Sequence, residues 1–177
     1  MRRLWMVILF LVIFLSWNVP MVIAQFREAG VEKLRVVVDA PDFTLKELGG
    51  GKISLKELRG KIILLNFFAT LCPNCRRECP SFVKLHEEFK NTDLVLLKVV
   101  AKEKEKDLIK YKKEFNISSP ILMDDNASIT NVYGVVSSPQ TFFINREGKI
   151  VGRILKEMDW TSKNARDLIE YLLKEKK

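Results

Sequence analysis

The most constraining feature of this chain is an apolar run at residues 61–69, KIILLNFFA. A continuous run of this length and composition is typical of a β-strand that is buried on both faces. A helical pattern follows over residues 72–90, in which Phe82, Leu85 and Phe89 recur at helical spacing. The sequence therefore predicts a buried strand that leads directly into a helix, as in an α/β domain.

Strand and helix patterns alternate along the rest of the chain. The other predicted elements are a hairpin around the glycines at 49–51, a buried strand at 93–101, a helix at 103–115, a short strand and a short helix at 120–135, a hairpin that turns at 146–149, and a closing helix at 161–177. Leu108 and Ile109 are expected on the apolar side of the helix at 103–115, and Thr161 or Ser162 at the N-cap of the last helix. This alternation predicts one α/β domain, residues 36–177, with a mixed sheet flanked by helices.

The first 24 residues have the pattern of a signal peptide or an N-terminal membrane anchor. Arg2 and Arg3 precede an apolar run, and small residues before position 25 form a cleavage site after Ala24. The same stretch is about long enough to cross a bilayer if it is not removed. In either case the two arginines should stay in the cytoplasm, so the rest of the chain is expected outside it, in the periplasm or on the outer face of the cell membrane.

The distribution of charged residues does not favour a nucleic-acid partner. The formal net charge is +8, from 30 basic and 22 acidic residues. The basic residues are interspersed with glutamates, as in the segment at 101–115, and form neither an Arg-rich block nor a pattern interleaved with aromatic residues. A solvated helix face is the expected structure, and a nucleic-acid partner is not indicated.

All three cysteines lie within eight residues, where the predicted strand passes into the helix. Cys72 and Cys75 form a Cys-X-X-Cys pair. At a helix N-terminus, free backbone N–H groups and the positive end of the helix dipole favour a thiolate, so Cys72 is the candidate nucleophile. Cys75 is one helical turn further on and is placed to resolve a mixed disulfide. The pattern predicts a redox dithiol.

Other uses of a Cys-X-X-Cys pair fit this chain less well. A zinc ribbon needs a second pair, which the chain lacks. Covalent haem attachment needs a histidine directly after the second cysteine, and Arg76 occupies that position.

Four further segments, spread along the chain, carry a family resemblance: APDFTL, SLKELRGK, NFFATLCPNC and YGVVSSPQTFFINREGK. With them, residues 38–174 resemble the thioredoxin superfamily, and most closely its TlpA/ResA-like extracytoplasmic branch. The resemblance implies a thioredoxin fold with an N-terminal β-hairpin and a central insertion. It also implies a thiol:disulfide oxidoreductase that needs no cofactor.

The resemblance assigns roles to four residues beyond the dithiol. Asn66 takes the place of the buried aspartate of cytosolic thioredoxins, and Pro139 should be a cis proline that faces the dithiol. Ser138 would offer backbone hydrogen bonds to a bound peptide. Glu78 would assist proton transfer to the buried thiol, although an exposed glutamate stabilised by the helix dipole explains the same position.

By the same resemblance, the protein would reduce disulfides of client proteins, for example apocytochrome c before haem attachment. It would receive electrons from a membrane thiol relay. The direction of transfer follows from the resemblance alone, because the Pro73-Asn74 pair between the cysteines does not specify a reduction potential.

Two residues depart from the family pattern. Leu71 replaces the tryptophan that usually precedes the first cysteine, which affects substrate fit more than chemistry. Cys79 replaces an apolar residue, and a small buried hydrophobic side chain is the favoured interpretation. The alternatives are a regulatory disulfide partner and a metal ligand.

Two other functions are compatible with related folds. Cys75 and Cys79 have the spacing of Sco-like copper chaperones, which also use a distant histidine, whereas the one histidine here, His86, is on the same predicted helix. Peroxiredoxins place a threonine three residues before the catalytic cysteine, where this chain has Ala69. Copper binding and peroxide reduction therefore stay the alternatives to dithiol exchange.

Overall fold

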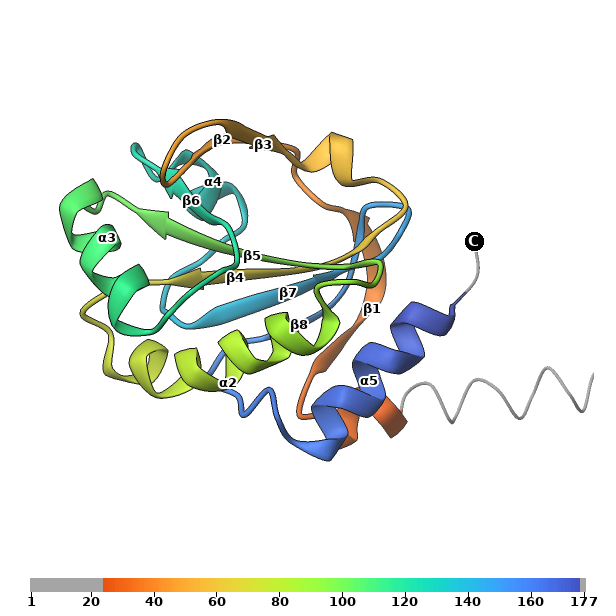
Figure 1. Cartoon of the computed structure of the whole chain (residues 1–177). Helices are drawn as coiled ribbons and strands as arrows, with labels where there is room; N and C mark the ends of the chain where they lie inside the picture. Colours follow the sequence, from red (N-terminus) through yellow and green to blue (C-terminus); the bar gives the residue numbers. More distant parts are fainter. Residues whose placement is uncertain (1–23, 176–177) are drawn as a thin grey trace, which may run out of the picture.

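The computed structural model describes residues 24–175. It has a central mixed sheet with helices on both faces (Figure 1). In chain order the elements are β1 (Glu32–Asp39), β2 (Thr44–Glu47), β3 (Lys52–Ser54), η1 (Leu55–Leu58), β4 (Ile62–Phe68), α2 (Pro73–Phe89), β5 (Leu94–Ala101), α3 (Glu105–Glu114), β6 (Ile121–Asp124), α4 (Ser128–Val132), β7 (Gln140–Ile144), β8 (Lys149–Ile154) and α5 (Lys163–Lys174). The predicted α/β class, a mixed sheet flanked by helices, is confirmed.

The strand β4 lies in the interior of the sheet. The strand order is β1-β8-β7-β4-β5-β6-β2-β3, with β4 parallel to β5 and antiparallel to β7. All seven residues of β4 are buried, as the apolar run predicted. Its side chains alternate between a core formed with α2 and α5 and a second core on the opposite face of the sheet. The strand therefore holds the start of α2 in a rigid position.

The predicted hairpins and cap are present. β2 and β3 pair around the glycines at 49–51, and β7 and β8 pair around a turn that is closed by a 2.9 Å hydrogen bond from the Gly148 N–H to the Asn145 carbonyl. Gly148 has φ +76°, a backbone conformation that residues with a Cβ atom adopt only with strain, so glycine suits this turn. Ser162 caps α5 by accepting from the Ala165 N–H. Between α3 and β7 the chain forms the strand β6 and the helix α4, and the predicted central insertion stays a prediction.

Two details of the sequence prediction need correction. Ile109 was expected on the apolar side of α3, but it is 55% exposed whereas Leu108 and Tyr111 are buried. Successive residues of a helix are rotated by about 100°, so α3 buries one narrow stripe and its neighbour Ile109 faces away. The edge strand β1 was not predicted, because its exposed valines, such as Val36, show no alternation, and backbone pairing with β8 forms it.

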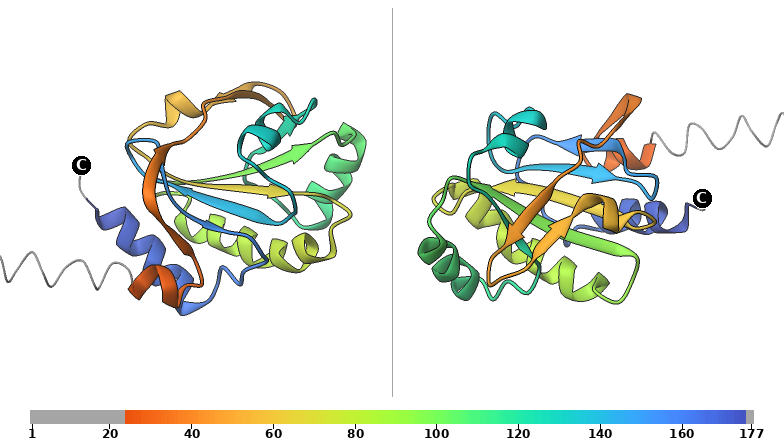
Figure 2. Two further views of the ribbon diagram at one scale, coloured as in Figure 1. Left: turned by 180° about the vertical axis from the view of Figure 1, so that it is seen from behind. Right: turned by 90° about the horizontal axis from the view of Figure 1, so that it is seen from above.

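Residues 24–35 precede the predicted domain and pack onto it. Residues 24–28 are helical and lie beside α5 (Figure 2). Phe26 is 2% exposed and lies over Gly152, where a Cβ atom would come within 2.9 Å of its ring. The predicted signal or anchor, residues 1–24, lies outside the described residues except for Ala24. Between residues 24 and 175, no helix is long and apolar enough to cross a membrane.

We expect Phe26→Ala to lower the free energy of unfolding by about 3 kcal/mol, because it leaves a cavity between β8 and α5. Urea unfolding of the purified chain, followed by circular dichroism, measures this loss. Val36→Ala is the control, since Val36 is 74% exposed and should change stability by less than about 0.5 kcal/mol. Equal stability of the two variants would show that the segment at 24–31 does not stabilise the domain.

Candidate active site

Cys72 is the N-cap residue of α2 and is partly exposed. Its Sγ accepts a hydrogen bond from the Cys75 N–H at 3.1 Å, so the sulfur takes the place of the usual capping oxygen. Pro73 follows at the first helical position, where its fixed φ suits the helix and its missing N–H costs nothing. The backbone N–H directed at the sulfur stabilises negative charge on it.

The loop before β7 completes the surroundings of Cys72. The Ser138–Pro139 peptide bond is cis, which agrees with the resemblance. The Cys72 thiol donates to the Ser138 carbonyl, with 3.3 Å between the sulfur and the oxygen. The loop thus faces the dithiol, and the proposed contact of Ser138 and Pro139 with a substrate stays a prediction.

Cys75 is buried beside Cys72, with 1% of its surface exposed. Burial raises the pKa of the Cys75 thiol to about 12, and its hydrogen bond with Cys72 contributes in the same direction. At pH 7 this thiol is therefore protonated in the folded protein. The two cysteines therefore differ in access: one sulfur can meet a substrate and the other is a protected proton donor.

Glu78 is 3% exposed, so the interpretation as an ordinary exposed glutamate is wrong. Its Oε1 accepts from the indole N–H of Trp160 at 2.9 Å and from the backbone N–H of Met158 at 3.2 Å. Its Oε2 accepts from the Asn66 amide at 3.1 Å. Burial raises the pKa of Glu78 despite these donors and the nearby Lys98, so the carboxyl can exchange a proton more readily near neutrality than an exposed glutamate.

Lys98, on β5, is buried beneath the same part of α2 and was missed by the sequence analysis. It is 1% exposed, and its Nζ donates to the Asn66 side-chain oxygen at 2.8 Å. The ammonium lies 4.6 Å from the ring centre of Phe68 and 4.4 Å from that of Phe82. Burial lowers the pKa of Lys98, while Cys79, Glu78 and Cys75 oppose this shift. A single charged residue within the apolar run at 94–101 was the available signal.

Asn66 links these two buried charges. Its side-chain oxygen accepts from Lys98, and its amide nitrogen donates both to Glu78 and to Thr141, the latter at 2.9 Å. The resemblance singled out Asn66 but did not predict what it contacts. In this chain the asparagine bridges a lysine on β5 and a carboxylate on α2.

Cys79 is fully buried, which confirms the favoured interpretation as a small core residue. Burial raises the pKa of its thiol. None of the three cysteines forms a disulfide in this structure. Among residues 24–175, no group of three or more His, Cys, Asp or Glu side chains is placed to hold a metal ion.

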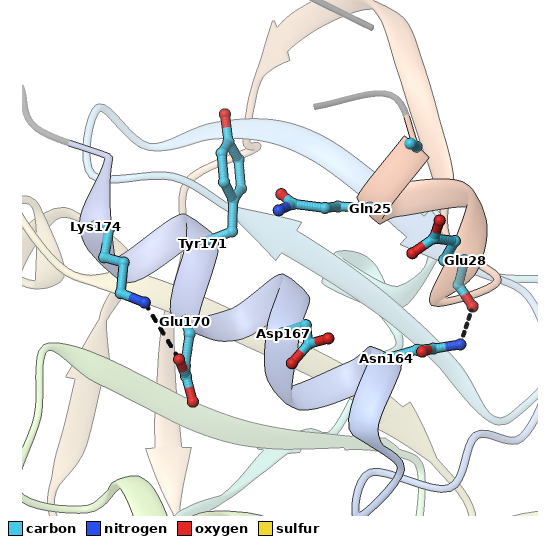
Figure 3. Close-up of a pocket in the computed structure, with 8 residues that line it drawn as sticks. Gln25, Glu28, Asn164, Asp167, Glu170, Tyr171 and Lys174 are labelled. Atoms are coloured by element: carbon cyan, nitrogen blue, oxygen red, sulfur yellow. Dashed lines mark hydrogen bonds and ion pairs between the residues drawn. The ribbon is translucent and has the colours of Figure 1, made fainter. Parts of the chain in front are cut away.

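A separate pocket of about 400 Å³ lies between the helical residues 24–28 and α5 (Figure 3). Its polar lining includes Glu28, Asn164 and Asp167, and the Asn164 amide donates to the Glu28 carbonyl at 2.8 Å. Figure 1 shows that α5 lies away from the end of α2 where the dithiol is. This pocket holds no part of the candidate active site.

A scan against family models matches residues 36–153 to the AhpC/TSA family. The chain belongs to this family. Among curated relatives, the thiol-disulfide oxidoreductase ResA of Bacillus cereus is 31% identical over 98% of this chain and 96% of its own length. ResA of Bacillus subtilis is 32% identical over 70% of this chain and 69% of its own length. This member of the AhpC/TSA family is a thiol:disulfide oxidoreductase.

The solved structures agree with the sequence relatives. A thiol:disulfide interchange protein of the thioredoxin family from Chlorobium tepidum superposes with a TM-score of 0.69. It is 25% identical and covers 79% of this chain and 99% of its own. The thioredoxin fold of this AhpC/TSA member therefore has close counterparts among known oxidoreductases.

We expect a brief treatment of the reduced, native protein with iodoacetamide at pH 7 to label one cysteine, Cys72. Cys75 and Cys79 are buried, and burial holds the pKa of both thiols above the usual range. Mass spectrometry of the intact protein and of its peptides counts and locates the labels. Cys72→Ser should remain unlabelled under the same conditions, and rapid labelling of Cys79 would contradict the structure.

The stability of the protein should depend on pH through Glu78. A raised pKa means that the folded state holds the proton more tightly than the unfolded state, so this contribution is fully present below the usual 4.5 and is lost as the pH rises through the folded-state pKa. We therefore expect the destabilisation caused by Glu78→Gln to shrink as the pH rises above 4.5. Urea unfolding of both proteins from pH 4 to pH 8 tests this, and a difference that grows with pH would contradict it.

Proposed function

We propose that this protein reduces disulfides of client proteins outside the cytoplasm, by dithiol exchange at Cys72 and Cys75. The observation that carries the proposal is the arrangement of the two sulfurs at the start of α2. Cys72 is accessible and receives a backbone N–H, whereas Cys75 is buried one turn further along. An accessible nucleophile with a protected resolving thiol is what a two-step exchange needs.

Reduction of a client disulfide takes two exchange steps. The Cys72 thiolate attacks one sulfur of a client disulfide, forms a mixed disulfide and releases the other client sulfur as a thiolate. Cys75 then loses its proton and attacks the Cys72 sulfur, which releases the second client thiolate and leaves a Cys72–Cys75 disulfide. The client gains two electrons and the protein loses two.

The second step requires a place for the Cys75 proton. We propose that Glu78 takes it, because this carboxyl is buried on α2, three residues after Cys75, and has a raised pKa. Lys98 acts electrostatically on both Cys75 and Glu78, so its charge favours the ionised form of each. Proton transfer inside the site would then cause no large change in the buried charge.

We further propose that the clients include apocytochrome c and that a membrane thiol relay supplies the electrons. The N-terminal pattern of two arginines and an apolar run supports an extracytoplasmic location. The similarity to the ResA oxidoreductases supports disulfide exchange with other proteins. A relay is needed because each cycle consumes two electrons and the oxidised dithiol must be reduced again.

Trapping tests the function and identifies the clients. Cys75→Ala, reduced and added to extract of extracytoplasmic proteins, should accumulate mixed disulfides that a thiol reductant releases. The matched control is the Cys72→Ser/Cys75→Ala double variant, which should trap nothing. Absence of trapped proteins, together with no reduction of insulin or of an oxidised apocytochrome c peptide by the unmodified protein, would overturn the proposal.

Copper titration of the reduced, unmodified protein tests the copper-chaperone alternative. Cys75 and Cys79 are separated by one helical turn and both are buried. Stoichiometric copper binding that is lost in Cys79→Ala, with insulin reduction unaffected by Cys72→Ser, would replace dithiol exchange by metal binding.

A further inference from the structure

A groove of about 850 Å³ runs beside the dithiol, between the turn that follows β4 and the start of α3. One wall is formed by Ala69, Thr70 and Leu71, the three residues before the nucleophile. The other wall comes from residues 102–110. Both walls lie at the same end of the molecule in Figure 1, where β4 gives way to α2. A client segment next to the reactive cysteine can therefore reach this groove.

The groove carries a positive charge that its own acidic residues do not neutralise. Four lysines of its lining are exposed and make no ion pair with any other described residue: Lys102, Lys104, Lys106 and Lys110. The sequence predicted a solvated helix face for the segment at 101–115, but it did not show that this face lies beside the dithiol. The positive end of the α3 dipole adds to the same field.

The carboxylates of the groove are engaged in holding its walls. Glu103 accepts a hydrogen bond from the Thr70 N–H at 2.8 Å, which joins the turn before Cys72 to the start of α3. Glu114 pairs with Arg76, whose guanidinium also donates to the Thr70 carbonyl at 3.2 Å. A neutral N–H does not cancel the charge of Glu103, so Glu103 and Asp107 remain as two negative charges against the four lysines. The local field is therefore positive and the walls are fixed relative to Cys72.

The groove also has an apolar edge on the side of the nucleophile. Leu71 is 90% exposed, and Val136, two residues before Ser138, is 95% exposed. Leu71 directly precedes Cys72, and Val136 belongs to the loop whose Ser138 carbonyl accepts from the Cys72 thiol. An apolar contact at the reactive cysteine would combine with charge pairing further along the groove.

We propose that this groove binds an extended, acidic segment that flanks the reactive cysteine of the client. The inference rests on the proposed function, because the mixed disulfide at Cys72 is what brings the flanking segment to the groove. Acidic side chains of the client pair with the lysines at the start of α3, and the charge complementarity raises the rate of productive encounter. Client selection thus resides in α3, outside the Cys-X-X-Cys motif.

The test uses three disulfide peptides that differ only in the residues flanking one cysteine: Asp/Glu, Ser/Gln or Lys/Arg. We expect kcat/KM for reduction to be about tenfold higher for the acidic than for the neutral peptide at about 10 mM salt, and lowest for the basic one. Near 150 mM salt the differences should narrow, because the screening length falls from about 30 Å to about 8 Å.

The Lys102→Glu/Lys106→Glu/Lys110→Glu variant should reverse the order of the acidic and basic peptides. The Lys52→Glu/Lys84→Glu/Lys113→Glu variant has the same net charge, and its exposed lysines lie outside the groove. It should keep the original order. Circular dichroism and urea unfolding establish that both variants are folded.

Three results would overturn the inference. These are equal rates for the three peptides with the unmodified protein, an equal change of order in both charge variants, and binding to anionic lipid vesicles that is lost in the groove variant without any peptide preference. Failure of the proposed function is a different result, since the unmodified protein would then reduce none of the peptides, including the neutral one.

Discussion

Replacing Cys72 with serine is expected to lower the rate of disulfide reduction by about three orders of magnitude or more, to the background of the assay. The serine hydroxyl can still cap α2, so the fold should be retained, but it is not ionised near neutral pH and cannot form a disulfide. The measurement is kcat/KM for reduction of a peptide disulfide, with the same chemical reductant recycling each variant.

Two further cysteine variants test the roles of the other two thiols. Cys75→Ser should give a single burst of mixed disulfide without turnover, because the second step has lost its nucleophile. Cys79→Ser is the matched control for a third thiol on the same helix, and it should retain turnover as long as the variant is folded. Turnover that survives Cys72→Ser but is lost in Cys79→Ser would contradict the assignment of Cys72 as the nucleophile and point to Cys79 instead.

The second large effect is expected from Glu78→Leu, which should destabilise the protein by about 3–5 kcal/mol. It removes the acceptor for Trp160 and Asn66, and it leaves the charge of Lys98 buried without a compensating carboxylate. Urea unfolding at pH 7 measures the loss. Glu147→Leu, on the exposed turn between β7 and β8, is the control and should change stability by less than about 0.5 kcal/mol.

A double variant separates the charge effect from the loss of hydrogen bonds. In Glu78→Leu/Lys98→Met both buried charges are gone, so the loss should be smaller than the sum of the two single losses by about 1–3 kcal/mol. The two residues are bridged by Asn66, which is why we expect coupling without a direct ion pair. Strict additivity would mean that Glu78 and Lys98 stabilise the fold independently.

The parts of this protein that sequence patterns predicted well are those governed by local periodicity. The apolar run at 61–69 predicted β4 because a strand buried on both faces has few polar positions. The helical spacing after it predicted α2, and the turn at 146–149 predicted the β7–β8 hairpin. By contrast, β1 is formed by backbone pairing at the edge of the sheet, and its exposed side chains show no period.

The candidate site, like the fold, has one part that the sequence predicts and another that depends on tertiary packing. The amino-acid sequence by itself determined the dithiol, because a helix that starts within about one helical turn of the end of a buried strand, here at Pro73 after Phe68, places the first cysteine at its N-terminus. Only the tertiary structure decided that Glu78 is buried, that Lys98 on β5 faces it through Asn66, and that the lysines of α3 line a groove beside Cys72. Residues 20 or more positions apart meet only after the sheet has formed, so burial and charge pairing between them depend on the packing of whole elements.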